Sequence, residues 1–168
     1  MQHPVVDTLN IYLDDVTGVV ATWGPTIFIV WRAHHSTAPI EAAELAVPDL
    51  VARYGDDRRL FYVHRAPGGA QVKSTPRVME AAMAHFERVD AHFAAAAVAI
   101  EADGFAGSII RSVTAGVLLV RKTAVRSASF KDARDGVRWL GAMSPGISPF
   151  DADAMIQALE NAGYCRVG

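Results

Sequence analysis

The sequence predicts a single α/β domain, in which helices pack on a mixed, largely parallel central sheet of about five to six strands. The order of segments is the first reason: after two opening strands, strand-like and helix-like stretches alternate four times, which demands helices layered on a sheet. Composition is the second reason, since 51% of the residues are hydrophobic and 20% are charged, as in a globular chain. The length of 168 residues suits one domain with a core of its own.

The N-terminal strands are predicted at 9–13 and 16–22. Asp14 and Asp15 form the turn between them, and Gly18 is a candidate bulge. These features predict an antiparallel hairpin at the start of the domain.

A third strand, TIFIVW at 26–31, follows a turn at Trp23-Gly24-Pro25. Its β-branched and aromatic residues do not alternate with polar ones, which predicts a strand covered on both faces. A helix is expected at 40–54, kinked or split at Pro48. Its apolar face is predicted to contain Ala43, Leu45, Val47, Leu50 and Val51.

The strongest helical pattern runs over 76–93, after a strand at 60–65 (LFYVHR) and a glycine-rich loop. His85 and His92 lie beside its apolar face and are expected at the surface or its boundary. The residues expected in the core are Val78, Met79, Ala82, Met83, Phe86, Val89 and Phe93.

The C-terminal half continues the alternation. The domain is taken as 1–143, with 144–168 as a C-terminal helical appendage of the same domain. The predicted elements are a buried strand at 95–100, a helix at 107–120 whose end GVLLVRK also fits a strand, a peripheral strand at 125–130, and helices at 132–143 and 151–162.

Charge, cysteine content and hydropathy narrow the classes of function that we expect for this chain. The net charge of −2 gives no field that favours nucleic acid. Cys165 is the only cysteine, and the N-terminus has no basic and apolar leader pattern, so a cytoplasmic protein is expected. No apolar stretch reaches membrane-spanning length. A mean hydropathy of +0.18 indicates apolar surface covered by a partner or a second copy, although an alanine-rich composition also produces such a value. Self-association as a homodimer is therefore one expectation.

Three stretches resemble the STAS-like proteins, relatives of bacterial anti-sigma-factor antagonists. They are TIFIVWRA with its following helix, LFYVHR with the STPRVMEAAM helix, and AAAAVAIEADGFAGSIIRSV followed by SASFKDARDGVRWL. The resemblance implies the same layered fold and a regulatory role through protein contacts. In the second of these stretches, phosphorylated members of the family carry an acidic residue, a serine or threonine, then glycine and leucine at the turn between the strand and the helix. Here Lys73-Ser74-Thr75-Pro76 stands there, so the resemblance supports the fold more than the phospho-switch.

Ser74 and Thr75 therefore have two interpretations. Thr75 before Pro76 is a good N-cap and first-turn pair. Alternatively, a phosphoryl group on either hydroxyl would be stabilised by the helix N-terminus.

A second group of candidates follows the strands, where open α/β sheets bind ligands. His64 and Arg65 end one strand, and Lys73 precedes the next helix, which together would suit an anion. Glu101 and Asp103 end the following strand, before Ser108 in the next helix. A pair of His64 with Glu101 or Asp103 would suit general acid–base chemistry, although these residues equally suit solvated strand ends and turns.

No cofactor fingerprint, nucleophile motif or set of metal ligands stands out, and neither a cofactor nor a metal is predicted. The adjacent His34 and His35 fit a solvated loop.

We expect a non-enzymatic regulatory or scaffolding module that contacts an unknown protein partner at the 64–75 edge. The alternative is a binding protein for a small apolar or anionic ligand. A basic cluster fits surface ion pairs or a partner contact: Arg111, Arg121, Lys122 and Arg126.

Overall fold

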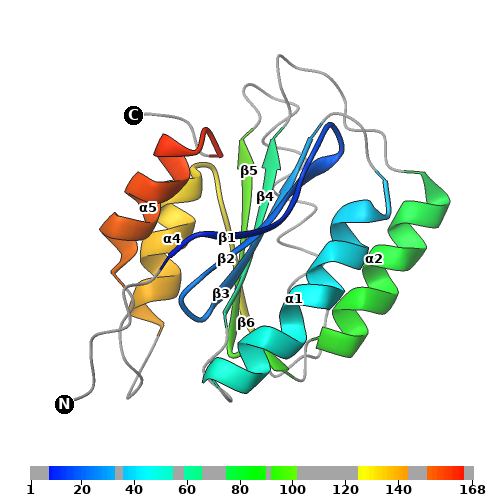
Figure 1. The fold of residues 1–168 in the computed structure, drawn as a ribbon, viewed down its shortest axis with the longest axis horizontal. Coiled ribbons are helices and arrows are strands. Elements are labelled where there is room, and N and C mark those ends of the chain that lie inside the picture. Colours follow the sequence, from blue (N-terminus) through cyan, green and yellow to red (C-terminus); the bar gives the residue numbers. More distant parts are fainter. Residues whose placement is uncertain are drawn as a thin grey trace.

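The computed structural model describes residues 8–32, 36–54, 59–65, 75–89, 92–101, 125–143 and 151–164. These residues form one six-stranded sheet in the order β1-β2-β3-β4-β5-β6, with helices on both faces (Figure 1). The strands are β1 (Asn10–Asp14), β2 (Gly18–Trp23), β3 (Thr26–Trp31), β4 (Arg59–Arg65), β5 (Ala95–Glu101) and β6 (Arg126–Phe130). The described helices are α1 (Ala38–Tyr54), α2 (Pro76–Val89), α4 (Ala133–Ala142) and α5 (Ala152–Asn161).

The sheet has an antiparallel part and a parallel part. β1 pairs antiparallel with β2 and β2 with β3, whereas β3, β4, β5 and β6 all pair in parallel. Parallel neighbours need crossover connections, and α1 and α2 supply them between β3, β4 and β5. The predicted mixed α/β class is therefore confirmed.

Each face of the sheet has its own hydrophobic core. α1 and α2 cover one face, and α4 and α5 cover the other (Figure 1). All six residues of β3 are buried, which confirms the prediction that this strand is covered on both sides. Ile27, Ile29 and Trp31 face the α1/α2 core, while Phe28 and Val30 face the α4/α5 core.

The antiparallel hairpins differ in one respect from expectation. The irregularity in pairing lies at Tyr12, between Ile11 and Leu13, so the prediction of a bulge at Gly18 is wrong. Gly18 instead permits close approach, since a Cβ there would lie 2.5 Å from the Val30 carbonyl oxygen. The predicted turn before β3 is confirmed, and Gly24 supplies its positive φ of 49°.

The buried face of α1 is built from smaller residues than the sequence predicts. Leu45 is 71% exposed and Val51 38% exposed, so their assignment to the core is wrong. The helix also continues through Pro48 without being split. Alanines spaced three and four residues apart pack against the sheet, and the larger Leu45 lies between those positions. The buried residues of α1 are Pro39, Ile40, Ala42, Ala43, Ala46 and Leu50.

Helix α2 ends at Val89, four residues before the predicted end at Phe93. Phe93 is buried nonetheless, just ahead of β5. Two assignments are wrong: Met83 is 43% exposed, whereas His85 is only 2% exposed. The inward stripe follows Val78, Ala81 and His85 at spacings of three and four, which turns Met83 away from the core. The side chains of Met79, Ala82, Phe86 and Val89 lie outside the described part.

The last two helices confirm their predictions within one residue. Asp132 caps α4 by accepting the Arg134 amide at 2.8 Å, and Asp151 caps α5 by accepting the Ala154 amide at 3.0 Å. Met155 and Leu159 of α5 are fully buried, so α5 is part of the α4/α5 core. The helix predicted at 107–120 lies outside the described residues.

Candidate functional site at the carboxyl edge of the sheet

The candidate site is the edge of the sheet at which β1, β3, β4 and β5 end. β1 runs in the direction of β3 because each is antiparallel to β2, and β4 and β5 are parallel to β3. We call this the carboxyl edge, and define it by Asp14, Arg32, Arg65 and Glu101, which end or directly follow those strands. Helices α1 and α2 also begin there, at the end of the molecule where β4 and β5 point (Figure 1).

The backbone register places three of the predicted residues, His64, Arg65 and Glu101, at this edge. His64 aligns with Trp31 on one side and with Ile100 on the other, and Arg65 aligns with Glu101. His64 and Glu101 are thus offset by one register position. Ser74, Lys73, Asp103 and Ser108 lie outside the described residues. The predicted pairing of His64 with Glu101 or Asp103 therefore stays a prediction.

Thr75 caps α2, as the sequence predicts. Its Oγ1 accepts the Val78 amide hydrogen at a donor–acceptor distance of 3.3 Å. Thr75, Pro76 and Arg77 are all exposed. The first turn of α2 holds no acidic residue, whereas the other described helices carry Glu41, Asp135 and Asp153 there. The positive end of the α2 dipole thus lacks a carboxylate in its own first turn.

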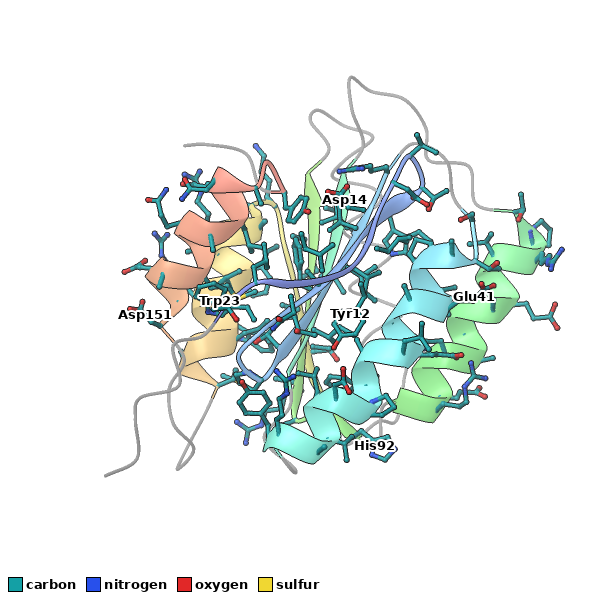
Figure 2. All side chains as sticks on the ribbon, in the orientation of Figure 1. Tyr12, Asp14, Trp23, Glu41, His92 and Asp151 are labelled. Carbon is teal, nitrogen blue, oxygen red and sulfur yellow. The ribbon has the colours of Figure 1, made fainter. Side chains whose placement is uncertain are left out.

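A cluster of ionic and aromatic side chains at the carboxyl edge was not predicted. The Tyr164 hydroxyl donates a hydrogen bond to Asp14 Oδ2 at 2.7 Å, and Arg32 Nη2 lies 2.9 Å from Asp14 Oδ1. Arg32 also donates to the Asp15 carbonyl oxygen. Figure 2 shows Asp14 at the same end of the sheet as the tips of β4 and β5. Three separate segments are therefore joined at one carboxylate.

Burial gives this cluster its electrostatic character. Tyr164 is only 3% exposed, and its ring packs against Phe28 with centroids 6.0 Å apart. Burial and the hydrogen bond to Asp14 raise the pKa of Tyr164 to about 12, so the hydroxyl stays protonated and donates. No sequence signal marks this contact, because Asp14 and Tyr164 are separated by 150 positions.

The tip of the β1–β2 hairpin adds an exposed apolar residue to the edge. Asp15 Oδ1 accepts the Thr17 amide at 2.7 Å and the Thr17 hydroxyl at 2.6 Å, and these bonds lower the pKa of Asp15. The turn holds Val16 between them with its side chain 73% exposed. An ordered turn thus presents a hydrophobic side chain to solvent.

A second ionic cluster joins α1 to α2. His85 Nδ1 lies 3.5 Å from Glu44 Oε1, and the Arg88 guanidinium donates to the same oxygen. The bond from Arg88 holds the pKa of Glu44 below its ordinary value, whereas burial lowers the pKa of His85 below 6.5. The neighbouring candidate His92 is exposed, as predicted.

Two kinds of feature are absent from the described residues. These residues contain no group of three or more His, Cys, Asp or Glu side chains that would hold a metal ion. None of the helices in the described ranges is long and apolar enough to cross a membrane. His34 and His35 lie outside those ranges.

Comparison of the chain with protein-family models, with curated proteins and with solved structures finds no match.

Proposed function

We propose that this protein is a non-enzymatic, STAS-like regulatory or scaffolding module that binds a partner protein at its carboxyl edge. The observation that carries the proposal is Val16, which is 73% exposed on a turn held by its two neighbours. Interfaces between proteins combine an apolar anchor with a polar rim. At this edge Val16 would be the anchor.

The polar residues of the edge support the same proposal. Asp14 forms an ion pair with Arg32 and accepts a hydrogen bond from Tyr164, and these contacts join the ends of β1 and β3 to the segment after α5. Exposed Thr75 and Arg77 at the start of α2 offer a hydroxyl and a cation to the rim. The contacts of Asp14 with Arg32 and Tyr164 hold these side chains in place before binding, so little of their entropy is lost when a partner binds.

The experiment is a quantitative affinity capture from the native organism with three forms of the protein. Val16→Ser removes the proposed anchor, and Val51→Ser is the control, because Val51 is also exposed but lies toward the far end of α1. We expect at least one protein to be captured by the wild type and by Val51→Ser but not by Val16→Ser. If no capture depends on Val16, the carboxyl edge is not the contact surface.

A charge switch at Ser74 or Thr75 is a hypothesis within this proposal. A phosphoryl group there would lie at the positive end of the α2 dipole, where the first turn holds no competing carboxylate. The partner found above would be titrated with the Ser74→Ala/Thr75→Ala and Ser74→Asp/Thr75→Asp variants. Equal affinities for both variants, after correction for any loss of stability, would exclude the switch.

A second candidate function is the binding of a small anion at the start of α2. The same first turn favours it, since Arg77 is exposed beside a cap without acidic residues. Calorimetric titration with inorganic phosphate would show saturable binding that Arg77→Ala abolishes and Arg53→Ala, in the last turn of α1, leaves intact. The absence of heat above dilution would exclude this function.

A further inference from the structure

The two edges of the sheet are protected to different degrees. β1 forms one edge and β6 the other (Figure 1). β1 carries an irregularity at Tyr12, a device that disrupts pairing with a further strand. β6 pairs with β5 in unbroken register from Arg126 to Phe130 and contains no proline. Its three central residues, Ser127, Ala128 and Ser129, are small and uncharged. β6 is therefore the edge that would accept another strand.

The hydrogen bonds of β6 identify which residues face outward. The Arg126 amide donates to the Ala94 carbonyl oxygen at 3.4 Å, so Arg126 directs its amide toward β5. Backbone groups alternate along a strand, and Ser127 and Ser129 therefore direct their amide and carbonyl groups away from the sheet. Within the described residues β6 pairs with β5 alone. Among the residues that the structure describes, no strand pairs with this outward row of donors and acceptors on Ser127 and Ser129.

We propose that two copies of this chain associate by antiparallel pairing of β6 with β6 around a two-fold axis at Ala128. Ser127 then faces Ser129 of the second copy, and each such pair exchanges both of its backbone hydrogen bonds. In this register the outward amide and carbonyl groups of Ser127 and Ser129 all form hydrogen bonds with the second copy. The two sheets become continuous.

The side chains are complementary in the same register. Arg126, Ala128 and Phe130 occupy alternate positions, and Phe130 packs on the α4/α5 side with its ring 5.7 Å from that of Trp139. Arg126 of each copy faces Phe130 of the other, on the side where the aromatic pair lies. A guanidinium beside aromatic rings is attracted by their π-electrons. Arg126 is exposed, and no like charges are paired across the axis.

Paired double variants test the register. Ser127→Glu/Ser129→Glu places two carboxylates opposite each other at both serine pairs, whereas Ser127→Glu/Ser129→Lys places opposite charges there. We expect wild type and the Glu/Lys variant to be dimers by sedimentation velocity. The dissociation constant of the Glu/Glu variant should be at least about tenfold higher. Ile11→Lys, at an exposed position of β1, is the control and should leave the dimer unchanged.

A covalent test does not depend on the stability of those variants. In a Cys165→Ser background, Ala128→Cys places two thiols at the two-fold axis, where antiparallel residues that are not hydrogen-bonded lie closest. We expect a disulfide-linked dimer on mild oxidation, and much less of it from Thr8→Cys, before β1. A wild type that remains monomeric up to about 100 µM overturns the proposal. A dimer whose dissociation constant is unchanged in the Glu/Glu variant, and that Ala128→Cys does not link, overturns it as well. The carboxyl-edge variants above should not alter the dimer, so the two proposals fail separately.

Discussion

The two faces of the sheet are built differently, and β5 shows how. Toward α4 and α5 the described side chains of this strand are Ala95, Ala97 and Ala99, and α4 packs mainly against it. Toward α1 and α2 it presents Ala96, Val98 and Ile100. The buried residues of α4 on this side are Ala133, Gly136, Val137 and Leu140. At β5, therefore, the row of side chains toward α4 and α5 has a smaller volume than the row toward α1 and α2, so the two faces leave different room for added volume.

The faces also differ in charge. The α1/α2 side encloses His85, which is 2% exposed and lies against Glu44. On the α4/α5 side the described ion pairs remain at the rim, as where Arg134 contacts Asp132 with both side chains about one third exposed, 30% and 38%. One face should therefore respond to pH and the other to changes in side-chain volume.

The largest expected effect is on the α4/α5 face. Phe28→Ala removes the ring that packs against Tyr164 and leaves a cavity, so we expect a loss of about 3–5 kcal/mol in the free energy of unfolding. Urea denaturation measures the loss. Hydrogen exchange should show that the amides of α5 lose more protection than those of α1. Equal loss in both helices would contradict the separation into two cores.

The alanine row offers a direct comparison on one strand. Ala97→Leu adds volume where α4 approaches, and overpacking should cost about 1–3 kcal/mol. Ala96→Leu, one position along on the α1/α2 face, should cost less because Ala96 is 8% exposed whereas Ala97 is fully buried. Thermal unfolding of the two variants compares them. If Ala96→Leu proves the more damaging, the interpretation that β5 has less room for added volume on its α4 side is wrong.

The buried histidine predicts how stability depends on pH. The pKa of His85 is lower in the folded protein than its ordinary 6.5, so the unfolded chain binds the proton more readily. Its contribution to stability is therefore fully present above that value and falls as the pH drops below it. Protonation of Glu44, whose pKa is also lowered, extends the loss toward more acidic pH.

Urea denaturation at about pH 7.5 and about pH 5.5 tests this dependence. His85→Leu should make the difference between the two conditions smaller, because it removes the titrating group from the α1/α2 face. His92→Leu is the control, since His92 is exposed. A pH difference that persists unchanged in His85→Leu would assign the effect to other groups.

The smallest expected effects concern the helix caps on the two faces. Asp132→Ala should destabilise the protein by about 1 kcal/mol, since Asp132 caps α4 and also binds the Arg134 side chain at 2.8 Å. Thr75→Ala should cost about 0.5 kcal/mol, because the single cap bond of α2 is longer, at 3.3 Å. Thermal denaturation of both variants gives the order. The reverse order would show that α2 depends on its cap more than α4 does.

Local chemistry was sufficient to predict much of the fold. β3 follows from its unbroken β-branched and aromatic run, and the turn before it from Gly24 and Pro25, because these residues restrict the backbone wherever they stand. α4 and α5 follow from their apolar spacing, whereas their caps at Asp132 and Asp151 were not assigned from the sequence. Thr75 was assigned as a cap on the same grounds.

Only the tertiary structure decided which residues face a neighbour. Leu45 and Met83 have apolar side chains at helical spacing, yet they are exposed, because the docking angle of each helix selects its buried stripe. His85 is buried by the same selection. The contact of Asp14 with Arg32 and Tyr164 has no local signature, since burial and long-range approach create it. Periodicity therefore determined the elements of this protein, and packing determined its charged contacts and its exposed apolar surface.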